Sequence, residues 1–277
     1  MSDPSGPSVP PHVPVGPFQV CDAASDAVVD AVVRGSQGCA GRRPWVAFAL
    51  HVGGLNSRTD PAYVAAMSRA DLVYADGVSV VLLARLAGGS RTERAGTTDI
   101  GWDVLRELGR VLGRPPRVAL IGGPEGLTQR AGAVFEAEAG VEVVATEHGY
   151  HSDWTEVLRR LAASGCDVLF VGLGAPFEMT WVDTHRAELP PCLVMTCGGW
   201  FGFVVADEQR APQWAQSAGL EWVFRVKQAP RRLARRYATG VGATAALAVR
   251  VVVDRSQGRR RAGAPRPPSA GPRRPGA

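Results

Sequence analysis

One carboxylate in this 277-residue chain occupies the position expected of a general base. Asp76 follows the apolar run 72–75 and precedes Gly77, with a second apolar stretch immediately beyond. A carboxylate at the carboxyl end of a strand can face a ligand bound at that edge and take a proton from its hydroxyl. The same position suits a residue that only caps the following helix, so both roles stay open at this point.

Arginines offer the complementary charge. Arg94, in the string RTERAGTTDI, could neutralise a diphosphate or pair with a surface acid. A denser group lies in residues 210–237, where two tryptophans and Glu221 accompany six arginines. This mixture fits neither a solvated helix nor a core helix, and it matches a diphosphate or an anionic lipid head group. The six are Arg210, Arg225, Arg231, Arg232, Arg235 and Arg236.

Residues that usually bind metals are not arranged for that role. The five cysteines are an odd number and show no Cys-x-x-Cys spacing. This pattern predicts neither a zinc site nor a disulfide framework. His148 and His151 share one loop sequence but have no third ligand at a suitable spacing. Because the chain also lacks an Asp-x-Asp motif, we predict no metal cofactor and expect arginine to neutralise substrate charge.

The elements that must position these residues follow an alternating pattern. Short β-branched runs end at glycine and alternate with helix-like stretches, as is typical of α/β proteins with a parallel sheet. We therefore predict a Rossmann-like, mostly parallel sheet with helices on both faces. Helices are expected from Asp60 to Ala70, from Pro124, from Ser152 or Asp153, and from Pro176. The expected strands lie within 45–54, 71–77, 117–123, 141–149, 167–174 and 192–199.

Glycines close most of these strands, at the edge where parallel sheets bind ligands. They allow backbone N–H groups to approach phosphate or sugar, which favours a nucleotide or a nucleotide sugar. Glycine is equally a normal turn residue in α/β proteins. The sequence has no complete Gly-x-Gly-x-x-Gly or Walker A motif, which disfavours dinucleotide dehydrogenases and P-loop NTPases.

Charge is divided unevenly along the chain. Of 31 basic and 26 acidic residues, 14 basic and 1 acidic lie in 225–277, which leaves 17 and 25 for 1–224. An acidic body with a basic C-terminal end argues against a uniformly basic nucleic-acid-binding domain. The tail also lacks interleaved aromatic residues, so no nucleic-acid partner is expected. An anionic membrane surface and a phosphorylated substrate remain as partners for the basic end.

The two ends of the chain differ in composition from its centre. Residues 1–18 and 256–277 are rich in proline and small or charged residues and are predicted to be disordered. Between them we expect an α/β domain over 19–224 and a basic helical appendage over 225–255. The N-terminus lacks the features of a signal peptide, and no segment reads as a confident membrane span, so a cytoplasmic location is the default.

Several strings in this order resemble the WecG/TagA/CpsF family, glycosyltransferase family 26: YADG, ERAGTTD, HGY, VGLGAP, RAPQW, GLEW and PRRLARRY. The resemblance implies an inverting transfer of N-acetylmannosamine, or its uronic acid, from a UDP donor to a sugar on a polyprenyl-diphosphate lipid. Such enzymes act in cell-surface polysaccharide synthesis. The resemblance also implies a location at the inner face of the cytoplasmic membrane. A basic C-terminal appendage would dock on that membrane and complete the active site.

The resemblance also implies roles for individual residues. Asp76 would deprotonate the acceptor hydroxyl, and Arg94 would stabilise the leaving diphosphate. Arg232 and Arg235 would be the appendage arginines, with Arg231 and Arg236 beside them. The full substrate-binding set is Asn56, Gly122, Tyr150, Gly172, Gly174, Glu178, Gly199, Arg210, Glu221, Arg225, Arg231, Arg232 and Arg235.

Two departures from the family pattern affect donor recognition. Phe177-Glu178-Met179 replaces the usual Lys-Gln-Glu, and Gly202 replaces the aspartate of a Phe-Asp-Phe string. They leave a second hypothesis open, a catalytically degenerate member that binds a nucleotide sugar or lipid. The donor sugar, the acceptor and any homo-oligomer are not fixed by the sequence.

Overall fold

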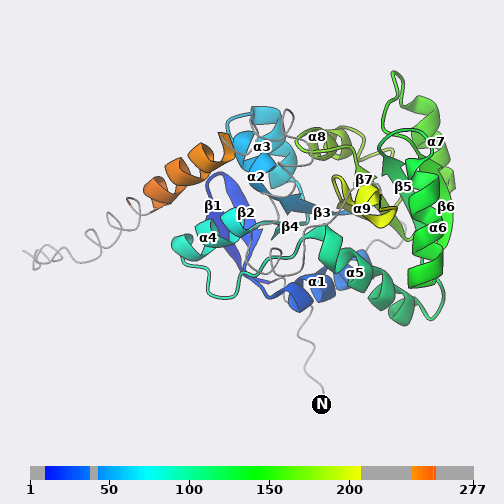
Figure 1. Cartoon of the computed structure of the whole chain (residues 1–277), viewed down its shortest axis with the longest axis horizontal. Helices are drawn as coiled ribbons and strands as arrows, with labels where there is room; N and C mark the ends of the chain where they lie inside the picture. Colours follow the sequence, from blue (N-terminus) through cyan, green and yellow to red (C-terminus); the bar gives the residue numbers. More distant parts are fainter. Residues whose placement is uncertain (1–9, 38–42, 207–238, 252, 254–277) are drawn as a thin grey trace, which may run out of the picture.

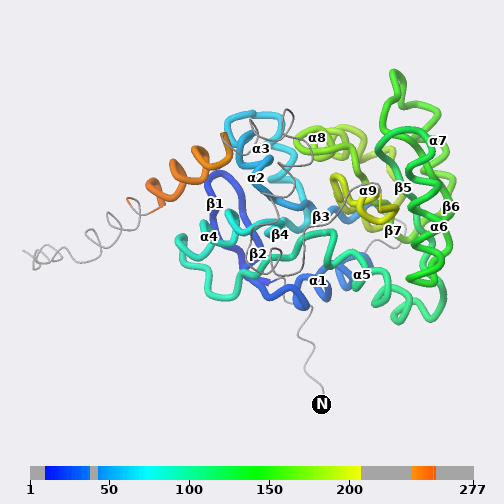
Figure 2. The backbone as a smooth tube through the Cα atoms, viewed as in Figure 1, coloured from blue at the N-terminus to red at the C-terminus, as the bar shows by residue number. Residues whose placement is uncertain are grey.

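A computed structural model describes residues 10–37, 43–206, 239–251 and 253 of the chain (Figures 1 and 2). Its centre is a six-stranded sheet of order β4-β3-β8-β7-β5-β6, in which every neighbouring pair is parallel. The predicted parallel α/β class is confirmed. The strands are β3 (Trp45–Leu50), β4 (Leu72–Ala75), β5 (Arg117–Gly122), β6 (Glu142–Glu147), β7 (Val168–Gly172) and β8 (Leu193–Thr196).

The central strands are apolar throughout because both faces of the sheet are covered. Val46, Phe48 and Leu50 of β3 enter one core, whereas Ala47 and Ala49 enter the other. Both cores are packed with side chains from helices, as predicted. One face carries α2 (Val52–Asn56), α3 (Pro61–Ser68), α4 (Val78–Ala87), α7 (Thr155–Ala163) and α8 (Phe177–Thr184). The other carries α1 (Ser25–Gln37), α5 (Thr97–Leu112), α6 (Leu127–Ala139) and α9 (Trp200–Val204).

A hairpin precedes the sheet and corrects one prediction. β1 (His12–Val15) pairs antiparallel with β2 (Phe18–Cys21), so the predicted disordered segment 1–18 extends too far along the chain. Its proline-rich composition masks an alternating pattern that buries the valines of β1 while Pro14 faces outward. Phe18 packs edge-on against Tyr63 of α3, with ring centroids 5.7 Å apart. The hairpin is therefore part of the main core.

Residues 239–251 form a helix that packs against this hairpin and α2. Ala243 and Leu247 are 4% exposed, and the Leu247 side chain fills the space beside Gly16. Figure 1 shows the helix extending from the edge of the body near β1. Within the described residues, no helix is long and apolar enough to cross a membrane. The domain boundary predicted at 224/225 lies outside the described residues.

Candidate active site

The carboxyl ends of the strands form the edge at which the predicted loops meet. β3 leads into α2 on one face of the sheet, and its neighbour β8 leads into α9 on the other. β7 and β8 diverge in the same way, since α8 and α9 lie on opposite faces. Adjacent strands that lead to opposite faces leave a crevice between their loops, the usual ligand site of open parallel sheets.

Asp76 stands at this edge, directly after β4. Its N–H donates to the Leu50 carbonyl of β3 at 2.8 Å, so the backbone is held between the two strand ends. The N-cap residue of α4 is Gly77, so Asp76 lies one position before the helix cap. Its half-buried side chain stands at the edge where the strands end.

Gly96 brings Arg94 and Asp76 together. A Cβ atom at Gly96 would lie 2.7 Å from Asp76 Oδ1 and 3.4 Å from Arg94 Nη1, so both side chains meet over this glycine. Arg94 Nη2 also donates to Asp99 Oδ2 at 2.6 Å. The two predicted catalytic residues are thus side by side. Arg94 also pairs with an acid, Asp99, which is the alternative role considered for it from the sequence. The sequence reading missed Gly96 and Asp99, although both lie in the ERAGTTD string.

A buried hydrogen-bond network lies beneath this pair, and the sequence reading missed it too. Tyr74 Oη lies 2.6 Å from Thr97 Oγ1, which donates to the Thr196 carbonyl at 3.1 Å. Burial raises the pKa of Tyr74 well above its ordinary value, against the lowering effect of the Thr97 hydrogen bond, and nearby Asp76 raises it further. Tyr74 is therefore neutral. The network ties β4, β8 and the start of α5 into one support for Asp76 and Arg94.

The predicted donor glycines lie where backbone segments approach closely. Gly122, at the end of β5, has φ +143°, and a Cβ there would lie 2.2 Å from the Gly172 carbonyl oxygen of β7. Only glycine fits at that position. Gly199 is the N-cap of α9, which places the start of that short helix beside the same loops.

Glu178 connects two of these loops from below. Its side chain is 1% exposed, and Oε2 accepts hydrogen bonds from Gly174 N at 3.0 Å and Gly198 N at 3.2 Å. Burial first, and the negative charge of Glu178 second, raise the pKa of Cys197 well above its ordinary value. Glu178 was predicted to bind substrate. In the structure its carboxylate holds two glycine loops, because the residue lies in the first turn of α8 under them. Its role in substrate binding stays a prediction.

Asn56 and Tyr150 are the remaining predicted residues that the structure describes. Asn56 ends α2, and its Oδ1 atom lies 3.7 Å from where a Cβ of Gly240 would be, so the 239–251 helix begins above it. His51 begins α2, and its Nδ1 accepts from Gly53 N at 2.9 Å. Tyr150 is 76% exposed in the loop after β6. Arg210, Glu221, Arg225, Arg231, Arg232, Arg235 and Arg236 lie outside the described residues.

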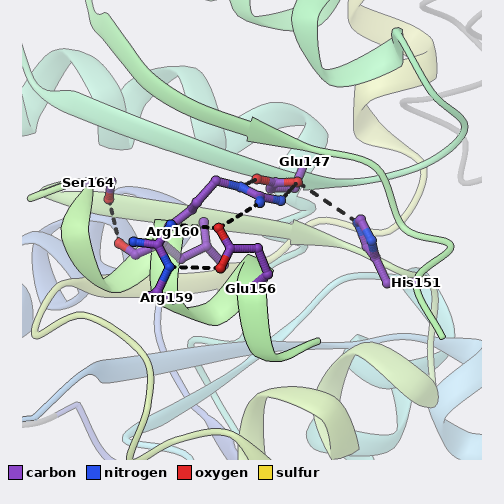
Figure 3. Close-up of polar contacts among 7 residues, drawn as sticks. Glu147, His151, Glu156, Arg159, Arg160 and Ser164 are labelled. Carbon is purple, nitrogen blue, oxygen red and sulfur yellow. Dashed lines mark hydrogen bonds and ion pairs between the residues drawn. The ribbon is translucent and has the colours of Figure 1, made fainter. Parts of the chain in front are cut away.

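The connection from β6 to α7 carries two neighbouring histidines, of which Figure 3 shows His151 with Glu147 and Arg160. The rings of His148 and His151 stack with centroids 3.8 Å apart. His151 Nε2 lies 3.9 Å from Glu147 Oε2, and Glu147 accepts from Arg160 Nε at 2.5 Å. Burial, and then the neighbouring His148, lower the pKa of His151. Within the described ranges, no group of three or more His, Cys, Asp or Glu residues is arranged to hold a metal ion.

The chain matches the model of a known protein family. The model of the WecG/TagA/CpsF glycosyl transferase family matches residues 15–261, which includes β2, the sheet and the Asp76–Arg94 region. This chain belongs to the WecG/TagA/CpsF family of glycosyltransferases. The match confirms the resemblance seen in the sequence, and it extends beyond the strings that first indicated it.

A curated relative of this glycosyltransferase comes from Bacillus spizizenii. It is an N-acetylglucosaminyldiphosphoundecaprenol N-acetyl-beta-D-mannosaminyltransferase, 28% identical over 194 residues, and the match covers 68% of this chain and 74% of the relative. Among solved structures, one described as a branched-chain amino acid ABC transporter from Silicibacter pomeroyi matches at 14% identity, with a TM-score of 0.28. That alignment covers 83% of this chain and 64% of the other, and at this score it carries no argument.

Proposed function

We propose that this glycosyltransferase moves N-acetylmannosamine, or a closely related sugar such as its uronic acid, from a UDP donor to a sugar on a polyprenyl diphosphate. The observation that carries the proposal is the meeting of Asp76 and Arg94 over Gly96 at the ligand-binding edge of the sheet. One group is suited to accept a proton, and the other to stabilise diphosphate charge. The Bacillus relative, which transfers N-acetylmannosamine to a lipid-linked acceptor, supports the choice of sugar and acceptor.

The proposed reaction is a single displacement with inversion. The acceptor hydroxyl attacks the anomeric carbon of the donor sugar as its proton passes to the Asp76 carboxylate. A bond forms between the acceptor oxygen and that carbon, while the bond from the carbon to the diphosphate oxygen breaks. UDP leaves with the bonding electron pair, and the Arg94 guanidinium stabilises the negative charge that develops on it. The appendage arginines would add to this stabilisation.

A turnover assay tests the assignment of the base. Purified enzyme would be given UDP-N-acetylmannosamine and other UDP sugars, with polyprenyl-diphosphate N-acetylglucosamine as acceptor. Asp76→Asn is expected to lower turnover by about 100-fold or more, because the amide cannot accept the proton. Asp60→Asn is the matched control, since asparagine can also cap α3 there. Near-normal turnover by Asp76→Asn would reject the assigned role.

The same assay distinguishes an active enzyme from a catalytically degenerate family member. The changes at Phe177-Glu178-Met179 and Gly202 are the reason to test this alternative. A catalytically inactive member would bind UDP in calorimetric titration yet transfer no sugar in the panel. Activity that persists in chelator is expected, because arginine neutralises the diphosphate in the proposed mechanism. Full loss of activity in chelator would contradict that part of the mechanism.

We also propose that the enzyme docks on the inner face of the cytoplasmic membrane through its basic C-terminal segment. The helix 239–251 buries Leu247 against the body, so that residue does not face lipid. Val241 and Val249 are 66% and 63% exposed and share one side, at helical spacing. Together with the arginines of 225–277 they suit an anionic lipid surface. Liposome sedimentation tests this by comparing the full chain with a chain that lacks residues 225–277. Equal sedimentation of the two proteins would contradict the proposal.

A further inference from the structure

A buried carboxylate outside the active site holds the segment that carries Arg94. Asp22 follows β2 directly and is 9% exposed. Its Oδ1 accepts from Thr92 Oγ1 at 2.6 Å and from Arg91 N at 2.9 Å, and its Oδ2 accepts from Ser90 N at 3.0 Å. These donors are three successive residues of the irregular connection between α4 and α5. One side chain thus satisfies polar groups that are 68 to 70 positions away in the sequence.

The contacts with Asp22 are those of an ionised carboxylate. Burial alone would raise the pKa of Asp22, but the hydrogen bonds from Thr92, Ser90 and Arg91 outweigh burial and lower it. Bonds from neutral donors to a charged acceptor are the stronger kind. Thr92 is itself fully buried, so water cannot replace its bond. Removing the Asp22 carboxylate would leave these donors without an equivalent acceptor.

Further bonds continue from this anchor to Arg94. Glu93 N donates to the Ala23 carbonyl at 3.1 Å, and Glu93 Oε2 accepts from Ser25 N at 3.1 Å. On the other side of Arg94, Ala95 N donates to the Ala75 carbonyl at 2.8 Å. The residue before Arg94 is therefore tied to the hairpin end, and the residue after it is tied to β4, one position before Asp76.

We infer that Asp22 is a positioning residue that sets the location of the Arg94 guanidinium relative to Asp76. The role assigned to Arg94 in donor binding rests on the proposed function, whereas the ordering of residues 90–96 by Asp22 does not. Asp22 itself touches no reacting group. It acts through the backbone of the 90–96 segment.

Hydrogen exchange tests the ordering without any substrate. Asp22→Ala and Thr92→Val are expected to speed exchange at the amides of Arg91 and Ala95, while Thr92→Ser, which keeps the hydroxyl, restores slow exchange. Asp167→Ala is the matched control, because Asp167 accepts from Arg117 N at 2.7 Å at the opposite end of the sheet. Thr92→Val keeps the proposal testable should Asp22→Ala fail to fold. Unchanged exchange at both amides in Thr92→Val would overturn the inference.

A double-mutant cycle tests the link to function. Asp22→Ala is expected to lower kcat/KM and weaken UDP binding by roughly 10- to 100-fold, as expected for a displaced catalytic group. In the Arg94→Ala background, Asp22→Ala is expected to lower kcat/KM little further, because the guanidinium that Asp22 positions is already absent. Additive losses would show that Asp22 acts independently of Arg94 and would overturn the positioning role. If the unaltered enzyme bound no UDP, the proposed donor would fail, and the exchange result would still decide whether Asp22 orders the segment.

Discussion

At the scale of single residues, the proposed active site depends on Gly96, which has no side chain. Gly96 has φ −59° and ψ 135°, a backbone conformation open to any residue, so conformational freedom does not explain this glycine. If alanine replaced Gly96, its Cβ atom would lie 2.7 Å from Asp76 Oδ1. The glycine is needed because the proposed base and its arginine share the space above it.

Gly96→Ala is accordingly predicted to impair catalysis more than folding. Turnover is expected to fall roughly 10- to 100-fold, since a shift of about 1 Å in a catalytic group has effects of that size. The free energy of unfolding is expected to change by about 1 kcal/mol or less, because the backbone suits alanine. Gly109→Ala in α5 is the control, with its Cβ 3.4 Å from Pro116 Cδ, and it is expected to leave turnover unchanged. Equal turnover in the two variants would contradict the prediction.

Glu178 gives a second prediction at this scale. Glu178→Ala removes the acceptor shared by Gly174 N and Gly198 N and is expected to destabilise the fold by about 2 kcal/mol while weakening UDP binding. Glu178→Gln, which restores the residue usual in the family at this position, keeps an acceptor oxygen and is expected to cost about 1 kcal/mol or less. Chemical denaturation and calorimetric titration measure the two effects. A glutamine variant as impaired as the alanine variant would show that the charge, rather than the acceptor, is what matters.

At the scale of elements, the sequence predicts the sheet well and the supporting contacts poorly. All six strands of the central sheet lie within the predicted segments. Five of them read as apolar runs because they are buried on both faces, whereas β6 is only half-buried. Asp76 could be picked out because it stands at the end of such a run. Asp22 and Thr92 could not, since their contact joins segments 70 positions apart. The β1–β2 hairpin was missed because prolines and glycine obscure its short alternation.

The connection between β6 and α7 predicts how stability varies with pH. The native pKa of His151 lies below its ordinary value of 6.5, so in that range the unfolded chain binds more protons than the native protein. The stability from neutral, buried His151 is present above about pH 6.5 and is lost as the pH falls through the native pKa. His151→Phe, which keeps a ring against Trp154, is expected to flatten the dependence of the melting temperature between pH 7.5 and 5.

His12→Gln is the control for that experiment, because His12 is an exposed residue of β1. It is expected to keep the pH dependence of the unaltered protein. Other groups also titrate in this range, so only the difference between the two variants bears on His151. A His151→Phe protein whose melting temperature falls with pH as steeply as that of His12→Gln would refute the assignment.

At the scale of the whole molecule, the two ends of the described chain meet beside the candidate active site. The hairpin packs on the helix 239–251 through Gly16 and Leu247, and the same helix begins against Val52 of α2, next to Asn56. The hairpin also ends at Asp22, which holds the Arg94 segment. The helix 239–251 and the segment 90–96 that carries Arg94 thus both contact the hairpin or the residue that follows it.

The helix 239–251 therefore has two sides with separable roles, and paired variants can tell them apart. Leu247→Ala is expected to lower the free energy of unfolding by about 2 to 4 kcal/mol, as for other buried leucines, with little direct effect on liposome binding by the folded protein. Val241→Ser combined with Val249→Ser is expected to leave stability within about 0.5 kcal/mol, because both side chains are exposed. The same pair is expected to weaken sedimentation with anionic liposomes by roughly tenfold, through the loss of apolar area. Chemical denaturation and vesicle sedimentation measure the two effects independently. If the valine variant bound liposomes as well as the unaltered protein, lipid contact would have to be assigned to the arginine-rich segments alone.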